Sequence, residues 1–360
     1  MKQTTINEMG NTELPIPPHF VAEKVGEIWR VEYQKIAQSA SDWARKYQIK
    51  PAAQDEFRVC LILVDVQNTF CIPGFELFVG GTSGSGAVDD NLRLAQFIYW
   101  NLNSITEIVP TMDTHQAMQI FHGIFFINDE GSHPDPYTQI SVEDIREGKW
   151  QFNHKLNHSL PYSSDYIERH LLHYTEVLKK AGKYDLTIWP YHAMLGGIGH
   201  ALVSSIEEAI FFHTIARFSE PHIHIKGDHP LTEHYSVLKP EVSTGPDGKP
   251  LPQRDESLFQ NPSSSRAIYQ KLIKNDLVII AGQAKSHCVA WTLSDLLQLT
   301  ASEENHLLNK IYLLEDCTSS VVVPGVIDYT DEADKAFEEF SEAGMNLVQS
   351  SDKIINWLSN

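Results

Sequence analysis

The chain has 360 residues, of which 42% are hydrophobic and 21% are charged, so it is long enough to bury a substantial core. Its formal net charge of -19 disfavours nucleic acid and anionic membranes as partners, because both would be repelled over most of the surface. No stretch reaches the roughly 18 apolar residues of a membrane span, and residues 1–20 lack the apolar segment of a signal peptide. These features predict a cytoplasmic protein that acts on a small molecule.

The chain begins with an extension, residues 1–57, whose amphipathic pattern predicts one or two helices that pack on the body or on a partner subunit. We therefore expect a homo-oligomer. In the body, residues 58–360, continuous apolar runs alternate with helical patterns, which is typical of a parallel sheet covered on both faces. The predicted fold class is α/β and doubly wound. The predicted strands are 59–66, 105–113, 186–190, 222–227, 277–282, 310–316 and 345–350, and the predicted helices lie within 89–103, 200–218, 265–275, 288–301 and 331–344.

Two segments interrupt this alternation. Residues 129–185 form a long insertion rich in His, Tyr and Asn, with a capping box at 141–144 that predicts the start of a short helix. We interpret His154 and His158 of this insertion as solvated surface residues. Residues 239–262 are rich in Pro, Gly and polar residues, and predict a surface loop.

Reactive side chains gather where the predicted strands end. In doubly wound folds, ligands bind beyond the carboxyl ends of the strands. Five successive predicted strands are each followed closely by one or two ionisable or metal-ligating residues, more than polar loops would give by chance. The residues are Asp65, Asp113, His115, His192, Lys226 and Cys288.

The first group predicts a metal site. Asp113 and His115 are two residues apart on an extended segment, so both side chains point to the same side. With His192 they make a set of two histidines and one carboxylate, which leaves coordination positions open and suits Zn, Fe or Mn. The alternative is a polar strand end with hydrogen-bonded histidines. His122 is a further candidate ligand.

Cys288 follows the strand 277–282 and begins the predicted helix 288–301. Amides and the dipole at a helix N-terminus favour a thiolate and can bind an oxyanion, so Cys288 is a candidate nucleophile. If Asp65 and Lys226 face the same crevice, the ammonium group keeps the carboxylate ionised while it takes the thiol proton. The alternatives are a structural Asp–Lys salt bridge and a buried cysteine at a strand–helix junction. We assign the latter role to Cys60, Cys71 and Cys317.

Six motifs in this order resemble the isochorismatase-like cysteine hydrolase superfamily, and among its members nicotinamidase/pyrazinamidase. The resemblance runs from about residue 59 to 349, and it implies one catalytic domain with a three-layer sheet architecture. The motifs are VDVQNTF (64–70), MDTH (112–115), WPYHAMLGGIG (189–199), KGDHPLTEHYS (226–236), GQAKSHCV (282–289) and EDCTSS (315–320).

The resemblance implies a role for each candidate residue. Cys288 would be the nucleophile, Asp65 the proton shuttle and Lys226 their electrostatic partner. The backbone N–H groups of Ala284 and Cys288 would form the oxyanion hole, and the peptide bond between Gln283 and Ala284 would be cis. One divalent metal ion would bind Asp113, His115 and His192, and an aromatic substrate ring would lie between Phe70 and Trp189 with its nitrogen at the metal.

The implied function is hydrolysis of a small, nicotinamide-like carboxamide to the acid and ammonia through a thioester on Cys288. Thr69 replaces an acidic residue often found before the aromatic residue of the first motif, and Ala193-Met194 replaces Cys-Val after the metal-binding histidine. The insertion 129–185 could roof the pocket and supply His133, Tyr137 or Trp150. The alternatives are an isochorismatase-type or ureide hydrolase, a non-haem iron oxygenase and a non-catalytic assembly module on this fold.

Overall fold

The computed structural model describes residues 14–251, 265–300 and 305–357, and its centre is one six-stranded sheet in the order β12-β9-β8-β1-β2-β7. Each pair of neighbouring strands is parallel, which confirms the predicted fold class. The chain order reverses between β1 and β8, so the crevice of a doubly wound fold lies beyond the ends of these two strands. The strands are β1 (Val59–Val64), β2 (Glu107–Asp113), β7 (His224–Lys226), β8 (Leu277–Gly282), β9 (Ile311–Leu314) and β12 (Asn346–Val348).

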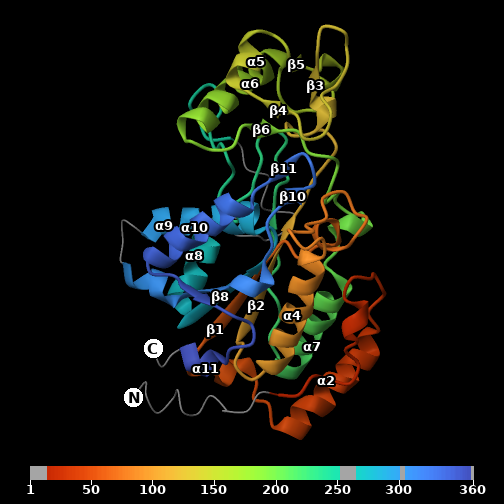
Figure 1. Cartoon of the computed structure of the whole chain (residues 1–360), viewed down its shortest axis with the longest axis vertical. Helices are drawn as coiled ribbons and strands as arrows, with labels where there is room; N and C mark the ends of the chain where they lie inside the picture. Colours follow the sequence, from red (N-terminus) through yellow and green to blue (C-terminus); the bar gives the residue numbers. More distant parts are fainter. Residues whose placement is uncertain (1–13, 252–264, 301–304, 358–360) are drawn as a thin grey trace.

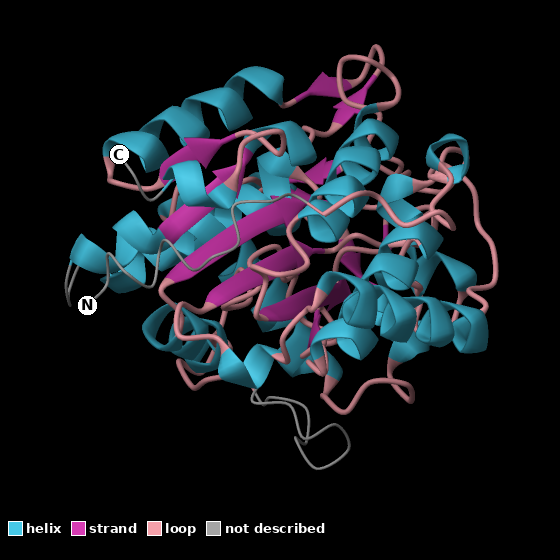
Figure 2. Cartoon of the chain, turned by 90° about the horizontal axis from the view of Figure 1, so that it is seen from below, coloured by secondary structure: helices cyan, strands magenta, loops and turns pink. Residues whose placement is uncertain are grey.

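Helices cover both faces of this sheet (Figures 1 and 2). On one face lie α2 (Tyr33–Tyr47), α4 (Gly86–Trp100) and α7 (Ser204–Arg217), and on the other α8 (Ser265–Lys274), α9 (Ala290–Thr300) and α10 (Thr330–Glu342). Alternate residues of β1 enter the two cores: Leu61 packs in the core of α4 and α7, and Ile62 in the core of α9 and α10. The strand is therefore apolar throughout rather than at every second position.

Short elements complete the body. α3 (Asn68–Cys71) follows β1, the hairpin of β10 (Val322–Val323) and β11 (Ile327–Asp328) follows β9, and α11 (Ile354–Trp357) follows β12. The predicted C-terminal glycine of α10 is in place, because Gly344 follows the helix in the left-handed region with φ +110°.

The insertion, together with the residues that flank it, folds into a lobe that stands apart from the sheet in Figure 1, with an apolar core that includes Phe125, Phe152 and Tyr174. The predicted capping box is present, because Ser141 and Asp144 exchange hydrogen bonds at the start of α5. The elements of the lobe are β3 (Phe126–Ile127), β4 (Gln139–Ile140), α5 (Val142–Arg146), β5 (Gln151–Phe152), α6 (Ser164–Lys180) and β6 (Leu186–Thr187).

One predicted strand of the main sheet is wrong. Residues 186–190 were expected in the parallel sheet, but only Leu186–Thr187 is a strand, and it pairs with β4 in an antiparallel two-stranded sheet. Leu186, Ile188 and Trp189 are buried in the core of the lobe. An apolar run shows that a segment is buried, whereas its sequence does not specify the strand it pairs with.

The described part of the extension, residues 14–57, contains one α-helix. α2 packs along α7, and its residues Ile36, Ala40 and Trp43 are buried in the core beneath. Within the described residues, no helix has both the length and the apolar character needed to span a membrane. The predicted surface loop 239–262 lies outside the described residues from position 252 onward.

Candidate active site

The carboxyl ends of the strands bring three of the predicted residues together. Lys226 Nζ lies 2.9 Å from Asp65 Oδ2 and donates to Cys288 Sγ at 3.5 Å. All three side chains are buried. Asp65 follows β1 and Lys226 ends β7. These strands are separated in the sheet by β2, and the two side chains contact each other across its end.

Local contacts orient Asp65 and Lys226. The Thr111 hydroxyl group, on the strand between them, donates to Asp65 Oδ1 at 2.6 Å and accepts from the Asp65 backbone N–H at 3.1 Å. Lys226 Nζ also donates to the His234 carbonyl oxygen at 2.9 Å and lies 3.0 Å from Asp113 Oδ1. Three oxygen atoms and one sulfur atom therefore lie within 3.5 Å of the ammonium nitrogen.

The charges of this cluster follow from burial and from the ammonium group. Burial lowers the pKa of Lys226, but the carboxylates of Asp113 and Asp65 outweigh it and hold the pKa well above its ordinary value, so the side chain is charged. Burial raises the pKa of Cys288 well above its ordinary value, against the opposing effect of Lys226. Burial also raises the pKa of Asp65. Cys288 is thus a thiol in the resting protein, next to a carboxylate with enhanced proton affinity.

Cys288 does not begin an ordinary helix as predicted. It lies in a π-helical turn, Lys285–Val289, and α9 starts two residues later at Ala290. The wider turn is a local feature that apolar periodicity does not reveal. The peptide bond between Gln283 and Ala284 is cis, as the resemblance implies. The neighbouring backbone N–H groups are used within the protein: that of Lys285 donates to the Ser319 carbonyl oxygen, and those of His287 and Val289 donate to the Ala284 carbonyl oxygen. The N–H groups of Ala284 and Cys288 remain the predicted donors of the oxyanion hole.

Asp113, His115 and His192 form a group that could hold a metal ion, because one ligand atom from each lies within 4.8 Å of the others. His115 Nδ1 faces the Gly227 carbonyl oxygen at 2.9 Å, and His192 Nδ1 faces that of Pro190 at 2.8 Å. Each ring therefore carries its proton on Nδ1 and presents a lone pair at Nε2.

Those lone pairs meet a carboxylate. His115 Nε2 lies 2.9 Å from Asp113 Oδ2, and His192 Nε2 lies 3.9 Å from the same oxygen. Burial holds the pKa of His192 well below its ordinary value, so this ring is neutral. A cation bound between these groups would satisfy all three at once. The donor set thus fits a divalent metal ion with open coordination positions.

Two neighbouring residues maintain this arrangement. Gln67 holds the end of β2, because its side-chain amide exchanges hydrogen bonds with the N–H and carbonyl groups of Asp113, both at 2.8 Å. Gly227 has φ +82°, and a Cβ atom there would overlap Asp113 Oδ1. His122 is not part of the group: its Nδ1 faces the Ala117 carbonyl oxygen, and its ring centroid lies 6.1 Å from that of His115.

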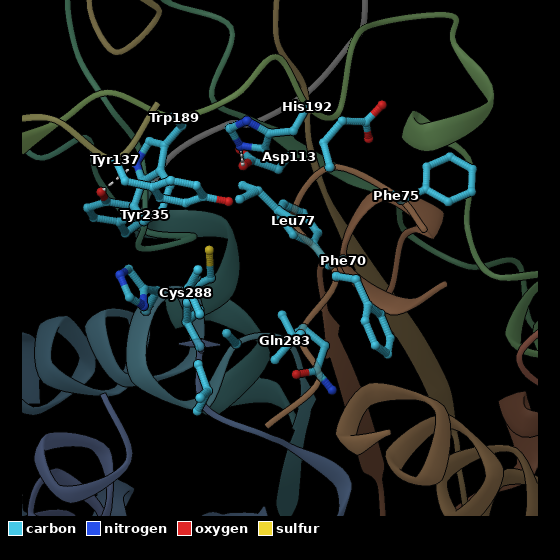
Figure 3. Close-up of a pocket in the computed structure, with 18 of the residues that line it drawn as sticks. Phe70, Phe75, Leu77, Asp113, Tyr137, Trp189, His192, Tyr235, Gln283 and Cys288 are labelled. Carbon is cyan, nitrogen blue, oxygen red and sulfur yellow. Dashed lines mark hydrogen bonds and ion pairs between the residues drawn. The ribbon is translucent and has the colours of Figure 1, made fainter. Parts of the chain in front are cut away.

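A cavity of about 230 Å³ opens over both clusters. Figure 3 shows Trp189 and Phe70 on opposite sides of it, with Leu77 between them in this view. Of the residues suggested from the insertion, Tyr137 lines the cavity. His133 faces the Phe126 carbonyl oxygen instead, and it and Trp150 are not among the described lining residues. The lining otherwise comes from residues 75–79 and 321–324, the segments around the two clusters, and Glu233, His234, Tyr235, Gln283, Ala284 and His287.

Sequence reasoning missed Glu233. Its carboxyl group accepts from Trp189 Nε1 at 2.6 Å, and the same indole N–H donates to the Tyr235 hydroxyl group at 3.0 Å. Burial raises the pKa of Glu233 well above its ordinary value. Both Glu233 and Tyr235 lie in the motif 226–236, beyond the end of the predicted strand 222–227, but nothing in the local sequence specifies Trp189 as their partner. Together they fix the plane of the Trp189 ring.

No family model and no curated protein matches the chain. Solved structures that match include a yeast nicotinamidase bound to nicotinaldehyde (18% identity, 81% of this chain, 99% of that chain, TM-score 0.48). Another is a nicotinamidase/pyrazinamidase of Acinetobacter baumanii (18% identity, 83% of this chain, 99% of that chain, TM-score 0.47). A third is a zinc complex of the pyrazinamidase of Pyrococcus horikoshii (17% identity, 81% of this chain, 99% of that chain, TM-score 0.40).

These names agree with the resemblance stated from the sequence motifs, and an isochorismatase-like hydrolase is also among the matches. At such identities and TM-scores, we take neither activity nor substrate from them. The function of this chain is argued from its own residues.

Proposed function

We propose that the protein is a metal-containing cysteine amidohydrolase that cleaves a small, nicotinamide-like carboxamide to the acid and ammonia. One observation supports this most directly: Lys226 contacts both Asp65 and Cys288 at the base of a cavity, beside a group of two histidines and a carboxylate. A thiol, a base and an ammonium group in contact are the parts that nucleophilic attack on a carbonyl requires.

The first half of the reaction forms the thioester. Asp65 takes the proton of Cys288 as the sulfur attacks the amide carbon, and Lys226 stabilises the negative charge at each stage. The carbonyl oxygen receives the displaced electron pair and is bound by the N–H groups of Ala284 and Cys288. When the C–N bond breaks, Asp65 returns the proton to the nitrogen, and ammonia leaves.

The second half releases the acid. Water attacks the thioester carbon while Asp65 takes one of its protons, and the Cys288 sulfur leaves and regains a proton. Asp113, His115 and His192 would hold the metal ion, which when bound supplies a Lewis acid that can bind a substrate nitrogen or water. Trp189, held by Glu233 and Tyr235, would form one wall for the aromatic ring of the substrate, and Phe70 would lie at the other side.

The charges of the lining favour an uncharged amide over the alternatives within the superfamily. Among the described residues that line the cavity there is no arginine or lysine. A substrate with a carboxylate, such as isochorismate or a ureido acid, would therefore lack a basic side chain of the lining to pair with. A neutral carboxamide does not need one.

The test is an ammonia-release screen over nicotinamide, pyrazinamide, aliphatic amides and ureido acids. We expect turnover with one or more neutral carboxamides, and a loss of at least about 1,000-fold in Cys288→Ala and in Asp65→Asn. Cys317→Ala is the matched control, because this cysteine is also buried but does not line the cavity. Unchanged turnover in Cys288→Ala would refute the proposed nucleophile.

A further inference from the structure

A second buried carboxylate lies behind the predicted oxyanion-hole loop. Asp90, on α4, is 2% exposed, and its Oδ2 accepts from the side-chain amide of Gln283 at 2.8 Å. Gln283 itself is 1% exposed. Arg93, from the same helix, donates to Asp90 Oδ1 at 2.9 Å and to the Asp316 carbonyl oxygen. The carboxylate is therefore fixed in place from its other side.

Gln283 is held at several other points. Its backbone N–H donates to the Val64 carbonyl oxygen at 2.7 Å, and its Oε1 accepts from the Ser319 backbone N–H at 3.3 Å. The Ser319 carbonyl oxygen in turn accepts from Lys285 N–H at 2.8 Å. The start of α4 touches the same segment: a Cβ atom at Gly86 would lie 2.6 Å from Ser319 Oγ. The network thus joins α4, the end of β1 and both ends of the short stretch from Gln283 to Lys285.

Ala284 is in the middle of that stretch. Donors in an oxyanion hole must be held within about 0.5 Å of their productive position to stabilise the transition state. We propose that Asp90 is a positioning residue for the oxyanion hole: through the side chain of Gln283, it holds the Ala284 N–H toward the carbonyl oxygen of a substrate on Cys288. This inference rests on the proposed function.

A carboxylate is an expensive way to fill this place if packing alone were needed. Burial raises the pKa of Asp90, and hydrogen bonds from Ser319, Gln283 and Arg93 oppose that shift. Apolar residues of similar volume often replace buried polar groups without loss of stability. What they cannot replace is a directional acceptor for the Gln283 amide.

The experiment compares Asp90→Ala and Asp90→Asn with the control Glu107→Gln. Glu107 is also a buried carboxylate with hydrogen-bonding partners, Lys271 and Asn275, but it lies at the amino end of β2, far from the active-site edge. We expect kcat of Asp90→Ala to fall on the order of 100-fold with KM within about threefold, as a displaced catalytic donor predicts. Asp90→Asn keeps an acceptor oxygen and should recover at least about tenfold. Glu107→Gln should keep kcat within about twofold at a comparable loss of stability in urea.

A second readout does not need turnover. Cys288 can add to pyridine-3-carbaldehyde: the S–C bond forms, the C=O π bond breaks, and the thiol proton passes through Asp65 to the oxygen, which lies where the oxyanion would. We expect Asp90→Ala to weaken this Cys288-dependent binding about tenfold or more, measured by titration, and Glu107→Gln to leave it within twofold. Iodoacetamide should alkylate Cys288 at wild-type rates in Asp90→Ala, because Lys226 and Asp65 are unchanged.

The outcomes are distinguishable. Equal effects of Asp90→Ala and Glu107→Gln on kcat and on aldehyde binding would overturn the positioning role of Asp90. If the wild-type protein binds the aldehyde through Cys288 but hydrolyses no amide, the proposed function fails, and the aldehyde titration alone decides the role of Asp90. If it does neither, both are wrong.

Discussion

Replacement of Lys226 by Met tests the charge cluster on which the site depends. The ammonium group is fully buried, and it lies 2.9 Å from a carboxylate oxygen of Asp65 and 3.0 Å from one of Asp113. Met has a similar length and no charge, so the substitution removes the cation with little change of volume. It leaves two buried carboxylates close to each other without their shared partner.

The size of the effect follows from the distances. At an effective dielectric constant of about 20, each contact near 3 Å is worth on the order of 5 kcal/mol, most of which offsets the desolvation of the charges. Removal of one partner of such a buried group typically lowers the free energy of unfolding by about 3–5 kcal/mol. Lys226→Met combined with Asp65→Asn removes one of the stranded charges, and should lose about 1–2 kcal/mol less than Lys226→Met alone.

Equilibrium unfolding in urea, with excess chelator so that no metal ion neutralises Asp113, measures these differences. Lys35→Met is the control, because both side chains of the Lys35–Glu32 ion pair are more than half exposed, and its loss should cost at most about 1 kcal/mol. If the free energy of unfolding of Lys226→Met were within about 1 kcal/mol of wild type, the ammonium group would not stabilise the two carboxylates as the distances indicate.

Two further predictions concern the metal site and the pH dependence of stability. Gly227→Ala would place a Cβ atom against Asp113 Oδ1 and should remove most of the bound metal in elemental analysis, whereas Gly248→Ala, with φ +75° but open space around it, should leave the metal content unchanged. Burial lowers the pKa of His213 to about 4 from the 6.5 of the unfolded chain, so its contribution is fully present above pH 6.5 and declines as the pH falls toward 4. At pH 5 this loss is about 2 kcal/mol of the free energy of unfolding. Urea titrations at pH 7 and pH 5 measure it, and His213→Gln should remove this part of the pH dependence. If the difference between the two pH values were the same in His213→Gln as in the wild type, His213 would not be its source.

The strand-end residues could be predicted because a parallel sheet brings the carboxyl ends of its strands to one edge. Asp65 comes directly after a fully buried run, and Lys226 is the buried last residue of β7. Where the run stops is visible in the sequence, and the convergence of the ends is a property of the fold rather than of any particular register. This reasoning therefore brought Asp65, Lys226 and Cys288 together correctly without any knowledge of their contacts.

The remaining features depend on pairings that leave no local pattern. Asp90 and Gln283 are 193 residues apart and belong to a helix face and a loop, so neither periodicity nor turn chemistry connects them. Glu233 lies in a loop, and its role as the acceptor of the Trp189 indole N–H depends on the position of Trp189 in the folded protein. The strands of the lobe are two residues long, which is too short for an alternating pattern to show.

The error over residues 186–190 changes how the metal site should be understood. His192 was expected at the end of a strand in the main sheet, but it follows β6 of the lobe, and its Nδ1 faces the Pro190 carbonyl oxygen. Bridges from Trp189 to His122 and from Met194 to His115 tie this segment to the one that follows β2. Two ligands therefore come from the sheet edge and one from a segment that the lobe holds. A metal ion bound by all three stabilises the lobe against the sheet, because it binds only when both are in place. The lobe is thus a structural part of the site and supplies a wall of the cavity through Trp189 and Tyr137.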